Sequence, residues 1–232
     1  MPRVPTKAEY AHEDLGSRFD SALSRFDTRR RLQVLVDEFL PDAQVAGKSV
    51  LDVGCGLGFF SERLVARGAK VVACDLGPTL VERTRVRARC TAVIADALEL
   101  AHVFGADRFD VVVSSECIEH TPAPADAIAQ MIAVLKPAGL LSLSTPNLVW
   151  QPIVRLATRL KLRPYDGHEN FSSWSSIRRT IERCGASVIA ERGLHLFPFQ
   201  LPLHTLSTWC DRHLQAARPA MINICVLAQK RR

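Results

Sequence analysis

The chain has 232 residues, of which 47% are hydrophobic, and its formal net charge is +6. This length suits one sizeable hydrophobic core and excludes two ordinary domains joined by a linker. No stretch approaches the roughly 20 consecutive apolar residues of a membrane-spanning helix, and residues 1–10 lack the apolar run of a signal peptide. We therefore expect a cytoplasmic protein.

The cysteines and the basic residues exclude some classes of protein and leave others open. The 7 cysteines are scattered and never form a Cys-x-x-Cys pair, so they predict reduced, mostly buried thiols. The basic residues fall into short clusters, such as Arg29 to Arg31 and the alternating Arg83 to Arg89, for which solvated helix faces are the favoured interpretation. Charge alone does not choose between a nucleic acid, a membrane surface and neither.

The first two thirds of the chain alternate between strand and helix patterns. Apolar spacing from Arg30 onward predicts an amphipathic helix that ends at Pro41, within an N-terminal helical cap over residues 1–46. After Gly47 the alternation predicts a parallel sheet that is covered by helices on both faces. The expected elements are strand 49–53, helix 59–67, strand 70–74, helix 79–87, strand 91–95, strand 109–115, a helix opened by Pro122 and Pro124 that runs to Leu135, and strand 140–144.

Two insertions are expected in the last third of the chain. The first, residues 148–171, holds a basic amphipathic helix, Pro152–Leu162, which fits either a lid over a pocket or a membrane contact. Helix 174–184 and strand 186–192 follow. The second insertion, residues 193–219, includes a proline-containing apolar stretch at 195–203 that excludes a regular helix and either lines an apolar pocket or packs on the sheet edge. A last strand covers residues 222–228.

A glycine turn follows the first strand of the expected sheet. Gly54, Gly56 and Gly58 stand between a buried strand and a helix, where the backbone turns sharply and a nucleoside can approach it. A dinucleotide-binding turn needs a small residue at the position of Phe59, and Asp52 places negative charge where a pyrophosphate would lie. The turn therefore favours a cationic nucleoside such as S-adenosylmethionine.

Two further aspartates end the next two strands. Asp75 ends the second strand, where a carboxylate can accept hydrogen bonds from ribose hydroxyls. Asp96 ends the third strand, in a position suited to the exocyclic amine of adenine, with Ala97 and Leu98 as candidates to pack on the ring. The candidate cofactor-binding residues are Asp52, Gly54, Gly56, Gly58, Asp75, Leu76, Asp96, Ala97 and Ser115.

Five motifs occur in one order between Ser49 and Asn147: Asp52–Gly58, Asp75, Asp96, Phe109–Val112 and Leu135–Gly139. In this order they resemble the class I S-adenosylmethionine-dependent methyltransferases, most of all the ubiquinone-pathway O-methyltransferases. The resemblance implies an α/β fold, a Rossmann-like doubly wound seven-stranded sheet with an antiparallel last strand and insertions after strands five and six. Ala138 stands where the family usually has glycine, which we expect to affect only the turn.

A Glu-x-x-Glu-His stretch, formed by Glu116, Glu119 and His120, follows the fourth strand. If the backbone turns helically there, the three side chains converge. Two carboxylates at close range repel each other unless a cation or a proton joins them. The stretch therefore predicts a divalent metal site.

A similar stretch supplies metal ligands in the ubiquinone-pathway enzymes and in the methyltransferases of small-RNA 3′ ends, and in the RNA enzymes a further histidine completes the set. The resemblance implies that His168 is this ligand, with Mg²⁺ or Mn²⁺ favoured and Zn²⁺ or Fe²⁺ as alternatives. A hydroxyl bound to such a metal loses its proton more readily. Other interpretations stay open: His120 as a metal-free general base, Glu116 as an orienting residue for a backbone amide or the methionine, and His168 as a loop residue that touches substrate.

The sequence thus predicts one methyltransferase domain over residues 1–232, with a cofactor-binding core at 47–147. It is expected to transfer a methyl group from S-adenosylmethionine to a hydroxyl of a small, partly apolar molecule, with Glu119 and His120 as catalytic residues. The alternatives are a metal-free methyltransferase, a methyltransferase of an RNA 3′-terminal 2′-hydroxyl, and an inert cofactor-binding partner. A nucleic-acid partner is not favoured, contact with the periphery of a membrane is an open alternative, and the sequence does not predict the oligomeric state.

Overall fold

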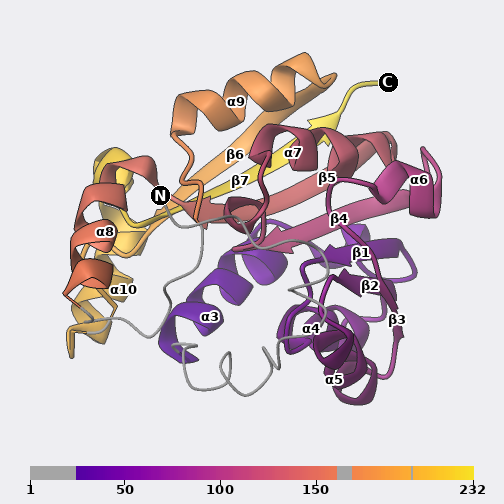
Figure 1. Cartoon of the computed structure of the whole chain (residues 1–232), viewed down its shortest axis with the longest axis horizontal. Helices are drawn as coiled ribbons and strands as arrows, with labels where there is room; N and C mark the ends of the chain where they lie inside the picture. The colour runs from indigo at the N-terminus through magenta and orange to yellow at the C-terminus, as the bar shows by residue number, and fades with distance from the viewer. Residues whose placement is uncertain (1–24, 161–168, 200) are drawn as a thin grey trace.

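The computed structural model describes residues 25–160, 169–199 and 201–232, and these form one mixed sheet between two helical layers (Figure 1). The strand order is β3-β2-β1-β4-β5-β7-β6. The strands are β1 Ser49–Val53, β2 Lys70–Asp75, β3 Thr91–Ile94, β4 Phe109–Ser115, β5 Leu135–Pro146, β6 Ala186–Leu194 and β7 Asn223–Lys230. Strands β1 to β5 pair in parallel, whereas β7 runs antiparallel between β5 and β6. The predicted doubly wound sheet with an antiparallel last strand is confirmed.

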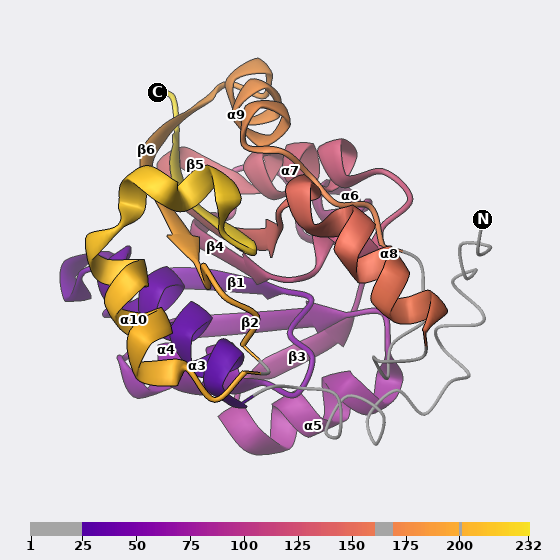
Figure 2. The ribbon, with the colours of Figure 1, turned by 90° about the vertical axis from the view of Figure 1, so that its left-hand side faces the viewer.

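The helices lie on the two faces of this sheet, as Figure 1 shows. One face carries α3 Arg25–Leu32, its continuation η1 Gln33–Glu38, α4 Phe59–Ala66 and α5 Pro78–Ala88. The other face carries α6 Leu100–Phe104, α7 Pro124–Ala133 and α9 Trp174–Arg183. The remaining elements are η2 Asp42–Gln44, η3 Ile118–His120, η4 Leu148–Trp150, α8 Gln151–Arg159, α10 His204–His213 and η5 Gln215–Ala220. Figure 1 shows α8 and α10 at the left-hand end of the molecule, and Figure 2, which faces this end, shows them apart, with α10 at the left and α8 at the right.

The central strands β1 and β4 are mostly apolar and buried because helices cover both faces of the sheet. In β4, Val112 packs into the core cluster on the α7 side, and its neighbours Val111 and Val113 pack into the cluster on the η1 side. This division follows from the strand geometry, in which successive side chains point to opposite faces. On the η1 side, Val34 and Leu35 are fully buried, which explains how the N-terminal helix docks on the sheet.

Besides shifts of about two residues at the ends of several elements, the structure differs from the predicted elements at three main places. The N-terminal helix already includes Arg25 and continues to Glu38 as a π-helix. Helices α6 and α10 were not expected; α10 begins directly after the apolar stretch 195–203, whose described residues contain no regular helix, as predicted. Strand β5 is longer than expected because it includes the turn before Gly139, where Ala138 has φ +63°. Within the described ranges, no helix combines the length and the apolar character needed to cross a bilayer.

Candidate active site

The glycine turn between β1 and α4 is shaped by two close packing contacts. Gly54 and Gly58 have φ values of +71° and +81°, in the left-handed region that favours glycine. A Cβ atom on Gly54 would lie 2.5 Å from Cys117 Sγ, and one on Gly58 would lie 2.9 Å from Thr84 Cα. Gly56 has nothing within 4 Å of such an atom. The turn is therefore packed at both ends and open in the middle, where a ligand can approach the backbone.

Asp75 connects this turn to the end of β2. Its Oδ2 accepts a hydrogen bond of 3.0 Å from the backbone N–H of Gly56, and its Oδ1 accepts one of 3.0 Å from Gly77. Burial raises the pKa of the Asp75 carboxyl, and the backbone hydrogen bonds oppose this shift. Asp75 lies at the strand end where the sequence predicted it, with its carboxylate held beside the open part of the turn. Leu76, the next residue, is half-buried.

Asp52 lies beneath the turn and is only 2% exposed. Burial raises its pKa to about 6, the charge of Asp75 adds to this shift, and a hydrogen bond from Ser61 Oγ opposes it. Among the described residues, the hydrogen bonds from Ser61 offset the burial of the charged carboxyl only in part, and no cation adds to them. A cationic ligand beside Asp52 would compensate it, because an opposite charge favours the ionised form of a carboxyl.

Asp96 follows β3, so the three aspartates come from the ends of β1, β2 and β3 at one edge of the sheet. Its Oδ1 accepts a hydrogen bond of 2.9 Å from the backbone N–H of Leu98. Asp96 and Ala97 are buried, at 8% and 7% exposed. Ser115 ends β4 at the same edge. The structure therefore brings the predicted cofactor-binding residues together along the carboxyl ends of β1 to β4, where ligands bind in open α/β sheets.

Glu116 and Glu119 point to different sides of the end of β5. Glu116 has φ +54° directly after β4, and its carboxylate accepts a hydrogen bond of 2.9 Å from Ser144 Oγ. Glu119, in η3, accepts a hydrogen bond of 3.1 Å from Thr145 Oγ1. Ser144 and Thr145 are consecutive residues of β5 and therefore face opposite sides of the sheet. The expected helical turn through Glu116 does not form, and the two carboxylates do not converge as the sequence suggested.

His120 remains beside Glu119. Its Nε2 lies 3.9 Å from Glu119 Oε1, and its side chain is 25% exposed, whereas that of Glu119 is 2% exposed. Burial raises the pKa of Glu119 well above its usual value, and the negative charge of Glu116 adds to this shift. The pair therefore combines a buried carboxyl with an imidazole that a substrate can reach.

The described residues do not form the predicted metal site. Among residues 25–160, 169–199 and 201–232, no three His, Cys, Asp or Glu side chains are grouped so that they could hold a metal ion. Both carboxylate oxygens of Glu116 already accept hydrogen bonds, one from Ser144 and one from Asn223. His168 lies outside the described residues, so the structure does not place the fourth expected ligand. Metal binding stays a prediction.

A buried ionic network that the sequence did not predict lies at the end of β4. Arg31 is only 4% exposed, so the expectation of a solvated face is wrong for it, as it is for Arg30 at 5%. The Arg31 guanidinium pairs with Asp27 at 2.9 Å and donates a hydrogen bond to Ser115 Oγ. His195 Nε2 lies 3.1 Å from Asp27 Oδ1, and His195 is fully buried. Three distant segments are thus joined beside the candidate site.

Asp27 is held in its charged form by this network. Burial alone would raise its pKa, but the charge of Arg31 and the hydrogen bonds from His195 and Arg31 lower it to about 2. The four-residue spacing of Asp27 and Arg31 is visible in the sequence and is typical of paired charges on one helix. Their burial and their contact with His195 depend on tertiary packing, which no sequence pattern signalled.

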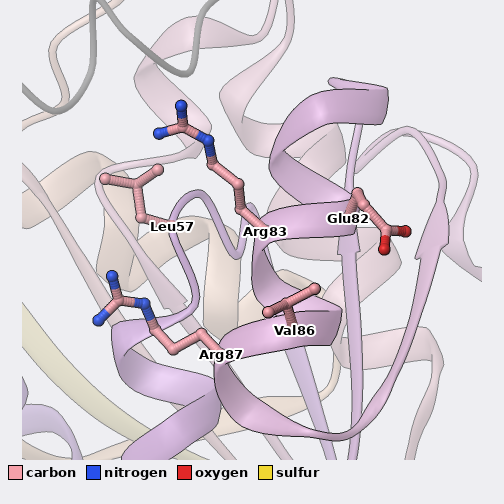
Figure 3. Close-up of a pocket in the computed structure, with 5 residues that line it drawn as sticks. All are labelled: Leu57, Glu82, Arg83, Val86 and Arg87. Carbon is pink, nitrogen blue, oxygen red and sulfur yellow. The ribbon is translucent and has the colours of Figure 1, made fainter.

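A separate open hollow of about 440 Å³ lies beside the glycine turn. It is lined by Leu57 of the turn and by residues of α5: Glu82, Arg83, Val86 and Arg87. Figure 3 shows both arginines extending to the side of α5 where Leu57 lies, while Glu82 points away from it. Arg87 also stacks over the Phe59 ring, with Cζ 4.1 Å from the ring centroid. None of the predicted acidic residues lines this hollow.

Comparison with known proteins places this fold and site in a family. The family described as "Methyltransferase domain" matches residues 25–191, more than half of the chain. The chain is 36% identical over 166 residues to a ubiquinone biosynthesis O-methyltransferase of Hahella chejuensis, a match that covers 68% of this chain and 70% of that protein. It is 31% identical over 166 residues to the corresponding protein of Nitrosococcus oceani, covering 67% and 70%.

A solved structure shares the fold at low sequence identity. The S-adenosylmethionine-dependent methyltransferase from Mesorhizobium loti superposes with a TM-score of 0.66 at 19% identity, covering 88% of this chain and 100% of that one. This likeness supports the sheet order and the helical layers. Together with the matched sequence family and the relatives above, it shows that the chain belongs to the methyltransferase domain family and is a class I S-adenosylmethionine-dependent O-methyltransferase close to the ubiquinone-biosynthesis O-methyltransferases.

Proposed function

We propose that this enzyme transfers the methyl group of S-adenosylmethionine to a hydroxyl of a small, partly apolar molecule, with His120 as the general base. The carrying observation is the placement of the Glu119–His120 pair after β4, at the sheet edge where Asp52, Asp75 and Asp96 lie at or near the carboxyl ends of β1, β2 and β3. The names of the relatives, which refer to ubiquinone biosynthesis, support a small acceptor rather than a macromolecule.

In this proposal the methyl donor, S-adenosylmethionine, binds along the carboxyl ends of β1 to β4. Asp52 provides negative charge for the cationic end of the donor, and Asp75, already fixed by two backbone N–H groups, accepts hydrogen bonds from the ribose. Asp96 accepts a hydrogen bond from the adenine amine, and Ala97 packs against the ring. The other proposed cofactor-binding residues are Gly54, Gly56, Gly58, Leu76 and Ser115.

Methyl transfer needs a group that takes the hydroxyl proton. The acceptor oxygen forms a bond to the methyl carbon while the carbon–sulfur bond breaks and its electron pair moves to sulfur, which leaves S-adenosylhomocysteine. The imidazole of His120 takes the proton, because it is the part of the pair that solvent and substrate reach. Glu119 lies 3.9 Å away; burial favours its neutral form, and the imidazolium that forms beside it favours its ionisation.

Metal assistance by Mg²⁺ or Mn²⁺ through Glu116, Glu119, His120 and His168 is the second candidate mechanism. The three described residues do not fit a shared metal ion. Glu116 accepts a hydrogen bond from Ser144 and Glu119 accepts one from Thr145, and these two residues face opposite sides of β5. A bound ion would make the acceptor hydroxyl more acidic. Turnover that persists in excess chelator supports His120 as the base, whereas lost turnover with intact donor binding supports the metal.

Peripheral membrane contact by α8 is part of the same proposal for a partly apolar acceptor. The helix exposes Ile153, Leu156 and Leu160, at 54%, 56% and 58%, beside the basic residues Arg155 and Arg159. This pattern is typical of helices that lie in the interface of a bilayer. Co-sedimentation with anionic vesicles tests it, and a variant with Ile153 and Leu156 changed to Ser should bind less if α8 makes the contact. We place the enzyme in the cytoplasm, with residues 1–232 as a single domain.

Product formation tests the proposed function directly. The enzyme is incubated with S-adenosylmethionine and a panel of catechols and polyols, and S-adenosylhomocysteine is measured. Conversion that depends on one of these acceptors supports O-methylation of a small molecule and excludes an inert cofactor-binding partner. Conversion with RNA alone, falling steeply as salt rises, would instead favour the RNA-end alternative.

A further inference from the structure

Asn223 carries a buried hydrogen-bond acceptor that has no partner in the described part of the chain. It is the first residue of β7 and is 2% exposed. Its Nδ2 donates a hydrogen bond of 3.0 Å to Glu116 Oε2, which fixes the orientation of the amide. Its Oδ1 accepts none from any described residue. Buried polar atoms are nearly always paired, so this oxygen is a place for a donor group that the described residues do not supply.

Hydrogen-bond acceptors surround this oxygen, and their own hydrogen bonds hold them in place. Glu116 directs both carboxylate oxygens at donors of the protein, Ser144 Oγ and Asn223 Nδ2. Its φ of +54° is a strained conformation for a residue other than glycine, and such strain is concentrated at functional sites. Ser144 Oγ also lies 3.1 Å from Ser115 Oγ, to which Arg31 donates. The amide of Asn223 is therefore held in place before any ligand arrives.

The strand order separates Asn223 from the proposed donor site. The three aspartates lie at or near the carboxyl ends of β1, β2 and β3, whereas Asn223 pairs with Pro146 at the carboxyl end of β5 and with Leu194 of β6. Glu116, after β4, lies between these two regions and near the Glu119–His120 pair in sequence. A group bound at Asn223 would therefore lie at the end of the sheet edge formed by β4, β5 and β7, away from the three aspartates.

We propose that Asn223 Oδ1 accepts a hydrogen bond from an O–H or N–H group of the methyl acceptor, and that Glu116 is the positioning residue that fixes the Asn223 amide. The inference rests on the proposed function, because it assigns one contact of the acceptor in that reaction. It gives Glu116 a role in acceptor binding that needs no metal ion.

Binding of catechol to the enzyme saturated with S-adenosylhomocysteine tests this contact. Asn223→Leu keeps the size of the side chain and removes the amide, so we expect catechol to bind about tenfold more weakly by calorimetry while the dissociation constant of S-adenosylhomocysteine stays within about twofold. Gln229→Leu is the matched control, because Gln229 is a hydrogen-bonded amide on the same strand at the far edge of the sheet. It should leave both affinities unchanged.

A double variant keeps the inference testable if Asn223→Leu folds poorly. Asn223→Asp places a second carboxylate beside Glu116 and should weaken catechol binding. Adding Glu116→Gln reverses the hydrogen bond, with the new amide donating to the new carboxylate, and should restore catechol affinity to within about threefold of the wild type. Failure of the double variant to restore affinity, in protein whose thermal unfolding matches the wild type, would contradict the role of the pair.

Other results overturn the inference and are distinct from failure of the proposed function. Unchanged catechol affinity in Asn223→Leu, a loss of S-adenosylhomocysteine affinity equal to the loss for catechol, or no binding of catechol to the wild-type complex would each overturn it. The proposed function fails separately, when the wild-type enzyme forms no S-adenosylhomocysteine with any hydroxyl acceptor of the panel.

Discussion

The two halves of the sheet edge are built in different ways. The donor half, formed by the glycine turn and the ends of β1 to β3, depends on residues that are close in sequence or lie on neighbouring strands, such as Asp75 and Gly56. The acceptor half, at the ends of β4, β5 and β7, depends on contacts between distant segments: Arg31 with Ser115, and Glu116 with Asn223. Short motifs describe the first half well, whereas only the folded chain reveals the second.

Removing the imidazole of His120 should have the largest effect on turnover. His120→Ala is expected to lower kcat by about 10²- to 10⁴-fold, the usual contribution of a general base, with donor affinity unchanged. The measurement is steady-state formation of S-adenosylhomocysteine, together with calorimetry of donor binding. His102→Ala, on the exposed surface of α6, is the control and should keep full activity. Near-normal kcat in His120→Ala would remove His120 as the base.

Breaking the ion pair between Arg31 and Asp27 tests whether the acceptor half of the sheet edge depends on α3. Arg31→Ala leaves Asp27 buried without its charged partner, and we expect the free energy of unfolding to fall by about 3–5 kcal/mol. Arg29→Ala, an exposed position on the same helix, should change it by less than about 0.5 kcal/mol. Urea denaturation measures both. Equal effects of the two variants would show that Arg31 is not part of a stabilising network.

The glycine turn offers a comparison within the donor half. Gly54→Ala forces a Cβ atom to within 2.5 Å of Cys117 Sγ at a left-handed φ, which should cost about 2–3 kcal/mol of stability. Gly56→Ala meets no neighbour and should cost about 1 kcal/mol, but its methyl group occupies the open part of the turn and should weaken donor binding. Denaturation and calorimetry separate these effects. Normal donor affinity in Gly56→Ala would contradict the proposed approach of the ligand.

The pH dependence of donor binding should sharpen the role of Asp52. The pKa of the Asp52 carboxyl is about 6, above its usual value, so in the free protein the protonated form contributes to the free energy of unfolding. This contribution is lost as pH rises through about 6. The cationic donor prefers the ionised carboxyl, so its affinity should increase about tenfold between pH 5 and pH 7. Calorimetry at several pH values measures this increase. Asp52→Asn should abolish it, and a pH dependence that survives this substitution must come from another group.

Local pattern was enough to predict most of the fold. The strands at Ser49–Val53 and Phe109–Ser115 have the predicted bounds, because each is a short apolar run between turn signals. Helix α10 was missed because its apolar residues Leu206 and Trp209 are largely exposed and leave no strong one-sided pattern. Length and periodicity therefore predict elements that pack on the core better than elements that lie on its surface.

The sequence predicted the candidate site correctly only where it also predicted the backbone conformation correctly. The aspartates at strand ends follow from the alternation of strands and helices, and the structure places them at one edge. Convergence of Glu116 with Glu119 assumed a helical turn, and the left-handed conformation of Glu116 removes it. The contact of Asn223 with Glu116 spans 107 positions in sequence, so no local rule could suggest it.

The insertion of β7 between β5 and β6 has a consequence for the order of folding. Strand β6 pairs with β7 alone in the sheet, so it cannot join the sheet before the later strand has docked against β5. The pairing of β5 with β7 joins segments that are far apart in the chain, such as Leu140 and Gln229, and such non-local pairing forms slowly. We therefore expect β6 to join the sheet only after β7 has docked against β5.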